Sequence, residues 1–331
     1  MEALLKQFVE LVGSGVAEQS TVHWSDTWEP SIDEAVRELP PPVHCPAELL
    51  RELHEVSVSP KRIALVMEGG EPLAVVPLKH VHGRWRLLTT WMIPGTLFPA
   101  RPGGHLRALV ALGMPVFVQW WRHDGPVPSH AGIRERRDIP AHRLECVAED
   151  EEHWRKSGLL KGVRRARKRC VHLRTEINRP GAARWTIEQW GRHWASDGQP
   201  SVPGTEELIA VARYWEPRHR HVTVSLVDGD EIAASVTLFI HGRDVVAMCN
   251  YRRREYDDLL IGTRLLDAAH QWALSSGKAT IDFGSEHAYL RRWAPESGTV
   301  SEFVVEAPPS WATRLARAAD SRLTSILPQR R

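Results

Sequence analysis

Val222–Gly284 reads VTVSLVDGDEIAASVTLFIHGRDVVAMCNYRRREYDDLLIGTRLLDAAHQWALSSGKATIDFG, and this stretch decides the fold. Val222–Val227 alternates apolar and small polar residues and ends at Asp228-Gly229, a dipeptide that supplies the positive φ of a tight hairpin turn. Ile232–Ile240 and Val245–Met248 are further apolar runs separated by turn residues. The stretch therefore predicts three consecutive antiparallel strands.

A long amphipathic helix is predicted after these strands. From Leu259 onward, apolar residues recur at steps of three and four until Gly277 supplies a stop. This spacing indicates one helix of about five turns. Ala279–Phe283 then has the pattern of a short buried strand. We expect it to lie parallel to its partner, because a crossover helix precedes it.

The same pattern occurs earlier in the chain. The interval from Gly70 to Gly83 equals that from Gly229 to Gly242, and both intervals close with His-Gly-Arg. A helical and a strand-like segment follow each copy. We interpret the two segments as one unit used twice, the alternative being two unrelated β-meanders that share a turn. Two domains are therefore predicted, residues 1–150 and 151–331.

Composition and length are those of an ordinary globular protein. The 331 residues contain 42% hydrophobic residues and carry a net charge of +2, which conceals local clusters of charge. No apolar stretch approaches the roughly 20 residues that span a bilayer, and Met1–Gly13 lacks the pattern of a signal peptide. We expect a cytoplasmic protein without a membrane partner. The 4 cysteines show no CxxC spacing, so neither a disulfide framework nor a metal site is predicted.

Glu152–Glu306 has the pattern helix, strand, two helices, three antiparallel strands, helix, strand, helix, strand. Its characteristic segments are the basic helix Lys161–Arg169, the hairpin Asp228–Ala234, the segment Tyr251–Leu266, and Asp282-Phe283-Gly284 with the following Tyr289–Trp293. With these segments in this order, the chain resembles the GNAT superfamily of N-acyltransferases, and in particular the tandem branch that includes the Fem aminoacyl transferases.

The resemblance implies an α/β fold with tandem GNAT-like domains, in which mixed, mostly antiparallel central sheets are flanked by helices. Residues 1–150 would form a degenerate GNAT-like domain and residues 151–331 the acyltransferase domain. It also implies that acyl-CoA is the donor substrate. The acyl carbonyl would lie where two central strands part, here Val245–Asn250 and Ala279–Phe283.

Candidate catalytic residues follow the second of these strands. Acyl transfer requires a polarised carbonyl, an unprotonated amine and a proton for the leaving group. The side chains that could serve lie in one short segment, at the strand end where ligands bind in open α/β sheets: Asp282, Glu286, His287 and Tyr289. Each also has a structural interpretation. Asp282 could cap a helix, His287 could be an exposed helix residue, and Tyr289 could be a core aromatic.

The donor-binding segment departs from the family pattern. The family has Gln or Arg, two residues, Gly, one residue, then Gly or Ala, whereas this chain has Asp257-Asp258-Leu259-Leu260-Ile261-Gly262 and keeps only the last glycine. Two acidic residues here would repel a phosphate, and nearby arginines could compensate. The predicted cofactor-binding residues are Asn250, Tyr251, Arg252, Arg254, Gly262, Thr263 and Arg264.

The basic helix is the candidate surface for a substrate or a transfer RNA. Its residues could neutralise several phosphates, although such a face is usually solvated. The predicted binding residues are Arg164, Arg165, Arg167, Lys168 and, after the last motif, Arg291. A further possible binding element, the tryptophans Trp185, Trp190 and Trp194, is spaced as the buried face of a helix, so core packing is predicted for them.

From this reading we expect an N-acyltransferase that moves an acyl group from acyl-CoA to a primary amine of a small molecule or amino sugar. Two alternatives stay open at this point. One is a Fem-like aminoacyl transferase that uses aminoacyl-tRNA, which the basic helix favours. The other is a non-catalytic binding protein of the same fold. Asp257, which would repel a phosphate, favours it, and so does Leu290, which stands where the tandem branch tends to have a lysine.

Overall fold

A computed structural model describes residues 20–40, 45–88, 98–122, 132–146, 154, 158–196, 204–285, 293–294 and 296–306. In the first half, the elements are β1 (Thr21–Ser25), α2 (Pro30–Glu38), α3 (Ala47–Val56), β2 (Lys61–Glu68), β3 (Glu71–Val81), β4 (Arg84–Leu87), α4 (Gly104–Ala111), β5 (Val116–Arg122) and β6 (Ile133–Glu145). In the second half, they are α6 (Leu160–Arg169), β7 (Arg174–Ile177), α7 (Ala182–Ser196), α8 (Thr205–Trp215), β8 (His221–Asp228), β9 (Glu231–His241), β10 (Asp244–Arg252), the 3-10 helix η1 (Arg254–Leu259), α9 (Ile261–Ser275), β11 (Thr280–Ser285) and β12 (Glu296–Val305).

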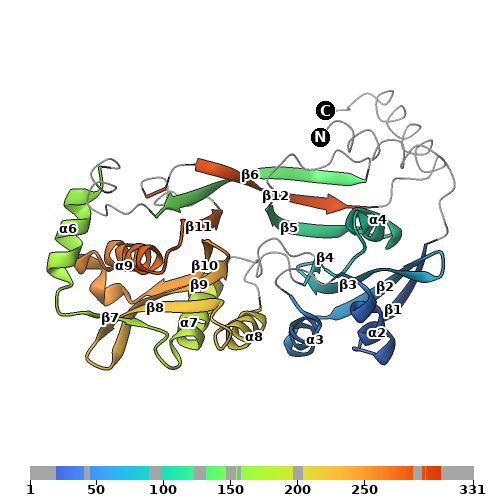
Figure 1. Cartoon of the computed structure of the whole chain (residues 1–331), viewed down its shortest axis with the longest axis horizontal. Helices are drawn as coiled ribbons and strands as arrows, with labels where there is room; N and C mark the ends of the chain where they lie inside the picture. The colour runs from blue at the N-terminus through green and yellow to red at the C-terminus, as the bar shows by residue number, and fades with distance from the viewer. Residues whose placement is uncertain are drawn as a thin grey trace, which may run out of the picture.

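The described strands form one sheet in the order β1-β2-β3-β4-β5-β12-β6-β11-β10-β9-β8-β7. Figure 1 shows helices α6 and α9 on one side of its C-terminal part, and α7 and α8 on the other. Parallel pairing occurs between β4 and β5 and between β10 and β11, whereas the remaining ladders are antiparallel. The predicted fold class, a mixed and mostly antiparallel sheet flanked by helices, is confirmed.

The stretch Val222–Gly284 folds as its sequence predicts. Strands β8, β9 and β10 form the antiparallel meander, with Gly229 (φ 57°) and Gly242 (φ 63°) in its turns. Helix α9 begins two residues later than expected because η1 occupies the segment up to Leu259. After Gly277 (φ 68°), β11 returns parallel to β10.

The order of elements recurs in the first half of the chain. Strands β2, β3 and β4 form an antiparallel meander, α4 follows, and β5 pairs parallel with β4. Each helix is also entered through a residue in the left-handed conformation, Gly103 (φ 70°) before α4 and Leu260 (φ 62°) before α9. The two units therefore share connectivity as well as turn positions.

The two units are joined by an exchange of strands. Strand β12, from the end of the described chain, lies between β5 and β6, and β6 in turn pairs with β11. One continuous sheet therefore runs through both units. The division near residue 150 stays a prediction, since β12 completes the part of the sheet that contains β5.

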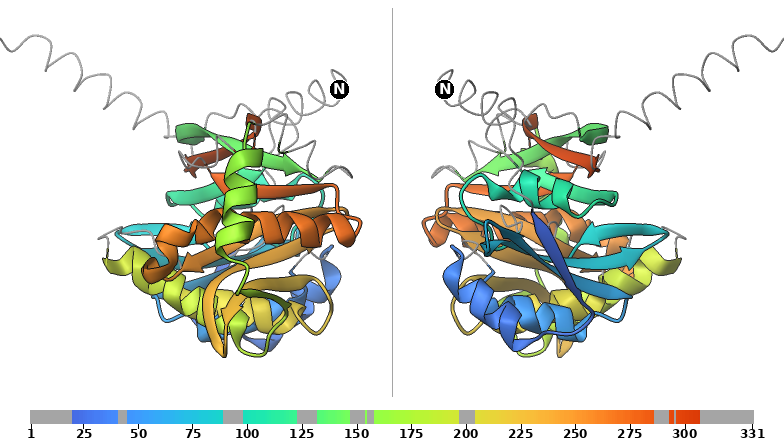
Figure 2. Two further views of the ribbon diagram at one scale, coloured as in Figure 1. Left: turned by 90° about the vertical axis from the view of Figure 1, so that its left-hand side faces the viewer. Right: turned by 90° about the vertical axis from the view of Figure 1, so that its right-hand side faces the viewer.

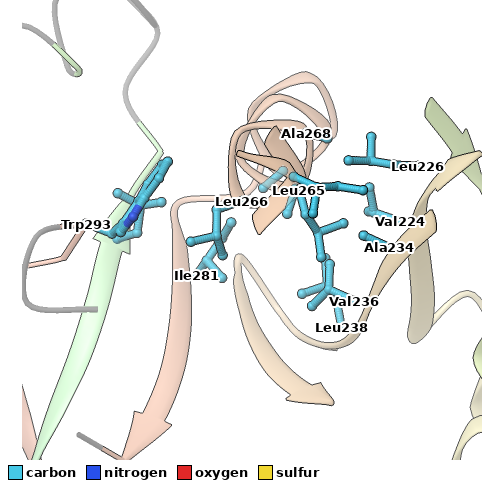
Figure 3. Close-up of a cluster of buried hydrophobic side chains, with 14 of the residues drawn as sticks. Val224, Leu226, Ala234, Val236, Leu238, Leu265, Leu266, Ala268, Ile281 and Trp293 are labelled. Atoms are coloured by element: carbon cyan, nitrogen blue, oxygen red, sulfur yellow. The ribbon is translucent and has the colours of Figure 1, made fainter. Parts of the chain in front are cut away.

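Hydrophobic clusters cover both faces of the C-terminal part of the sheet. On one face, α9 packs on β8, β9 and β11, and Figure 3 shows Leu265 and Leu266 projecting from α9 toward Val236 and Ile281. On the other face, α7 and α8 pack on β9 and β10 together with α3 of the first half. Helix α6 lies across α9, as the left panel of Figure 2 shows.

A buried ion pair connects the two halves next to this second cluster. Lys79 Nζ of β3 lies 3.2 Å from Glu207 Oε1 of α8, and the side chains are only 5% and 1% exposed. Ser57, which follows α3, donates its hydroxyl hydrogen bond to the same Oε1 at 2.8 Å. A charge removed from water is stabilised only by such partners. The ion pair therefore fixes the position of α8 relative to β3.

We expect Glu207→Gln to destabilise the protein strongly, because Lys79 would remain buried without its counter-charge. The loss in unfolding free energy should be about 3–5 kcal/mol, measured by urea denaturation. A matched control is Asp26→Asn, which removes the pair of Arg62 and Asp26 with side chains 49% and 74% exposed. That pair should contribute at most about 1 kcal/mol. Equal losses in the two variants would contradict the structural role of Glu207.

Candidate active site

The strands β10 and β11 pair over three positions and then part. Their ladder joins Asp244 to Thr280, Val245 to Ile281 and Val246 to Asp282. β11 pairs with β6 over the same three residues and again at Ser285, whereas β10 continues beyond the three positions to Arg252 along β9 alone. A bulge between Ala247 and Cys249 interrupts the β9–β10 ladder just past the fork. The expected parting of these strands is confirmed.

The parting leaves one edge of β10 without a neighbouring strand in the part of the chain that the structure describes. A strand edge presents backbone N–H and C=O groups in a row. Fixed N–H donors beside a carbonyl oxygen can stabilise the negative charge that develops during acyl transfer. The segment from Ala247 to Arg252 can therefore supply the polarising groups from its backbone.

Side chains at the end of β10 point alternately to the two faces of the sheet. Cys249 and Tyr251 lie on the face covered by α7: Cys249 is buried in the cluster there, and the ring of Tyr251 is 5.6 Å from that of Trp185. Asn250 between them is exposed and lies on the face of α9. The predicted residues Asn250 and Tyr251 are thus separated by the sheet.

Asp282 lies at the fork, 4% exposed. Its Oδ1 accepts a hydrogen bond of 2.7 Å from the backbone N–H of Gly284, and its Oδ2 is 3.4 Å from Nε of Arg143 on β6. Both carboxylate oxygens are therefore engaged in shaping the strand end, as in a side-chain turn rather than a helix cap. The remaining residues predicted for this segment, Glu286, His287, Tyr289 and Arg291, lie outside the described residues.

Cys249 is the thiol nearest the fork on β10. It is 1% exposed, and burial raises the pKa of its thiol far above the usual range. A thiol held in its neutral form is a poor nucleophile. Burial therefore argues against Cys249 as a nucleophile.

The segment between β10 and α9 ends in a left-handed residue directly before a helix. Leu260 stands where the family pattern has its first glycine, and it adopts the left-handed conformation (φ 62°, ψ 38°) that a glycine would adopt without strain. The 15-residue helix α9 starts directly afterwards, so its first N–H groups and its dipole point out of this turn. Gly262 and Thr263 lie in this first turn.

The turn is held by α6 and by its own charges. Arg169 donates to the carbonyl of Asp258 at 2.6 Å, and the Cys170 thiol donates to that of Leu259 at 3.3 Å. Arg252 Nε donates to Asp257 Oδ1 at 2.6 Å. Asp257, which was expected to repel a phosphate, is thus neutralised within the turn.

Arg167 and Arg264 share a buried carboxylate. Asp267 is fully buried, and Arg167 binds it with two bonds, Nε to Oδ2 at 3.0 Å and Nη2 to Oδ1 at 2.7 Å. Arg264 Nη1 adds a third bond at 3.0 Å. Arg167 ties α6 to α9, and Arg264 pairs with the same carboxylate within α9, so we assign both a structural role and leave them out of the proposed binding surfaces.

The other basic residues of α6 lie on its outer face. Val163 and Ala166 are buried toward α9. The exposed members of the helix are Lys161, Arg164, Arg165, Lys168 and Arg169. At the beginning of η1, Arg254 is exposed as well. A positive surface therefore runs along α6 toward the turn before α9.

Sequence reasoning missed two residues that organise this region, Arg143 and Asp267. Arg143 lies on β6, which the sequence assigned to the other domain, and Asp267 is an acidic residue among the buried, mostly apolar residues of the amphipathic helix α9. An acid on the apolar face of a helix is a signal for a buried ion pair, because it requires a partner. The sequence offered no comparable signal for Arg143.

The described residues contain neither a membrane-spanning helix nor a metal-binding cluster. None of the described helices has the length and apolar character needed to cross a bilayer. Within the same residues, no three His, Cys, Asp or Glu side chains are grouped in a way that could hold a metal ion.

Comparisons with known proteins were made on sequence and on structure. Residues 157–293 match a family model described as an acetyltransferase (GNAT) domain. No curated protein sequence matches the chain. The matched segment contains the fork, the turn before α9 and the basic helix.

Three solved structures are similar over most of the chain. The C-terminal domain of a putative lysylphosphatidylglycerol synthetase from Agrobacterium fabrum has 12% identity and a TM-score of 0.51, over 88% of this chain and 94% of that one. L-PGS from Bacillus licheniformis has 12% identity and a TM-score of 0.50, over 87% and 95%. A conserved protein of unknown function from Bacteroides thetaiotaomicron has 9% identity and a TM-score of 0.51, over 86% and 99%.

At these identities the structural likeness concerns the fold, whereas the family model concerns the sequence of the segment that carries the fork. Residues 157–293 are therefore matched to a GNAT acetyltransferase domain, and the chain as a whole shares the fold of these structures.

Proposed function

We propose that the protein is an N-acyltransferase that moves an acyl group from acyl-CoA to a primary amine of a small molecule. The observation that carries this proposal is the fork, where β10 and β11 pair at three positions and then part beside a bulge. The acyl thioester would lie along the edge of β10 from Ala247 onward. Its pyrophosphate would lie at the first turn of α9, where Leu260 holds the backbone in the required conformation.

The transfer would proceed by direct attack. The amine nitrogen forms a bond to the thioester carbon, the carbonyl oxygen becomes negatively charged, and backbone N–H groups of β10 stabilise it. Collapse of this intermediate breaks the carbon–sulfur bond, and the proton lost by the amine goes to the departing thiolate. The amide and free coenzyme A are the products.

In this proposal Asp282 acts as a positioning residue. Its bond to the N–H of Gly284 shapes the end of β11, and its contact with Arg143 ties that end to β6. Both interactions fix the end of β11 at the point where it parts from β10. Glu286, His287 and Tyr289 follow this strand end and remain the proposed groups for proton transfer.

A test of the donor site is Gly262→Ala. The added methyl would meet only the side chain of Arg252, with Cδ at 3.5 Å and Nε at 3.8 Å, so the fold should accept it. Unfolding free energy should stay level or rise by up to about 1 kcal/mol, because alanine favours a helix. The methyl group would cover amides that hold the pyrophosphate. We therefore expect KM for acetyl-CoA to rise about tenfold, in an assay of thiol release with a panel of amines.

The control for this variant is Gly162→Ala on α6, where the added methyl meets nothing within 4 Å. It should raise stability in the same way and leave KM for acetyl-CoA unchanged. A donor KM that is equal in the two variants would remove the first turn of α9 from the donor site.

Asp282→Asn tests the fork itself. Asparagine can still accept from Gly284 but loses the charge that faces Arg143, so the end of β11 should shift. We expect kcat/KM to fall about 10- to 100-fold, with a small change in stability because Arg143 is 41% exposed. Asp138→Asn on the same β6 region removes an exposed pair with Arg136 and should leave the rate unaltered. An unchanged rate in Asp282→Asn would exclude Asp282 from the mechanism.

A second candidate is aminoacyl transfer from a charged transfer RNA. It is favoured by the exposed basic residues of α6, which continue toward the turn before α9. Several lysines and arginines on one helix face can bind phosphates along an RNA backbone. In this case the basic face would hold the RNA, and the aminoacyl ester would enter the same fork.

The second candidate predicts that replacing Lys161, Arg165 and Lys168 with alanine weakens binding of transfer RNA and lowers the slope of affinity against salt by about 1 per lost contact. Titrations at several salt concentrations measure this. The control replaces three arginines elsewhere, Arg37, Arg62 and Arg107. Transfer that survives ribonuclease, together with equal affinity in both triple variants, would rule the RNA donor out.

A further inference from the structure

Aromatic side chains gather on the α7 face of the sheet beside the fork. Tyr251, near the end of β10, lies between two residues of α7, with ring centroids 5.6 Å from Trp185 and 6.5 Å from His193. The His193 ring is 5.5 Å from that of Trp194, which lies 6.4 Å from Trp190. We call Trp185, His193, Trp194 and Tyr251 the aromatic wall.

The aromatic wall differs from the tryptophans of the core. Trp154, Trp215 and Trp293 are 0%, 7% and 7% exposed and belong to the hydrophobic clusters. Trp185, Trp194 and Tyr251 are half-buried and belong to none of the clusters formed by the described residues. The prediction of core packing fits Trp190, which packs against the cluster under α7, and does not fit Trp185.

The orientation of Trp185 is set by a charge. The guanidinium carbon of Arg253 lies 6.0 Å from the centre of the Trp185 ring, and Arg253 is itself held by Glu231 at 2.9 Å. A cation over one side of an indole restrains the ring. Trp185 is therefore fixed before any ligand arrives, which lowers the entropy cost of binding.

The aromatic wall and the proposed donor site lie on opposite faces of the sheet. Asn250, α9 and the turn that would hold the pyrophosphate are on one face, and Tyr251 and α7 are on the other. Tyr251 is three residues past the bulge at Met248, a distance of about 10 Å along an extended strand. An acceptor resting on the wall could therefore bring a nitrogen to the fork from the side opposite the donor.

We infer that the aromatic wall is the acceptor subsite and that the acceptor carries its amine on, or next to, a ring with an apolar face. This inference rests on the proposed acyl transfer and adds the class of acceptor. Half-buried aromatic rings bind the apolar face of another ring, either the CH face of an amino sugar or the π face of an aryl amine. An acyclic polyamine offers no such face.

The test measures acceptor binding to the full-length protein by calorimetry, without a donor. The probes are glucosamine, tyramine and the acyclic 1,4-diaminobutane. We expect at least one ring amine to bind more tightly than 1,4-diaminobutane. Trp185→Ala and Tyr251→Leu should each raise its Kd by up to about tenfold, the range of an aromatic pair. Trp185→Phe keeps a ring and should retain most of the affinity. Which ring amine responds identifies the source of the ring.

The matched control is Trp24→Ala. Trp24 lies on β1 at the opposite edge of the sheet and is 40% exposed, so its loss should leave every Kd unchanged. In turnover assays, Trp185→Ala should raise KM for the ring amine and leave kcat and the donor KM nearly unaltered.

The outcomes separate the two proposals. Ring-amine binding that depends on Trp185 in a protein without thiol release would overturn acyl transfer and keep the subsite. Thiol release with a Kd that Trp185→Ala, Trp185→Phe and Tyr251→Leu leave unchanged would overturn the subsite and keep acyl transfer. Tightest binding of 1,4-diaminobutane would also overturn it.

Discussion

The site depends on where β11 stops pairing with β10. Up to Asp282, β11 lies between β6 and β10 and pairs with both; after Asp282 its ladder with β10 ends, whereas Ser285 still pairs with Ala141 of β6. A sheet whose strands all stayed paired would have no strand edge in its interior. The edge of β10 to which we assign the donor therefore arises where β11 parts from β10 and keeps β6 as its neighbour. Strand β12, which lies between β5 and β6, makes the sheet continuous from this point into the first unit.

Charged groups hold the surroundings of the fork in place without lining it. Asp267 is fully buried on α9, where it joins α6 to α9 through Arg167 and also pairs with Arg264 of its own helix. Arg169 and Cys170, at the end of α6, hold the turn before α9 by its carbonyl groups. Part of the basic helix therefore has a structural role, because the buried carboxylate of Asp267 requires a positive partner, which Arg167 supplies. Only its outer face is left to meet a ligand.

The turn before α9 departs from the family's sequence pattern, yet Leu260 still has a left-handed backbone conformation. The family pattern places glycine where this chain has Leu260, and Leu260 still adopts the left-handed backbone conformation. A side chain in this conformation costs of order 1–2 kcal/mol, which must be offset elsewhere. The bonds from Arg169, Cys170 and Arg252 to the neighbouring residues can offset it. The residue types alone predicted a weakened phosphate site, whereas the structure shows that Leu260 adopts a conformation typical of glycine directly before the N-terminus of α9.

The sequence by itself determined the order of the elements, the two similar units and the position of the fork on β10 and β11. It could do so because alternation, helical periodicity and glycine turns are local properties of the chain. Only the tertiary structure decided that β12 lies beside β5 and that Arg143 meets Asp282 across 139 residues of sequence. It also decided that Arg167 pairs with the buried Asp267, 100 residues away. The half-buried ring of Trp185 contacts that of Tyr251 outside the hydrophobic clusters, which again only the tertiary structure shows. Strand neighbours and ion pairs depend on which surfaces pack together, and no local pattern records that packing.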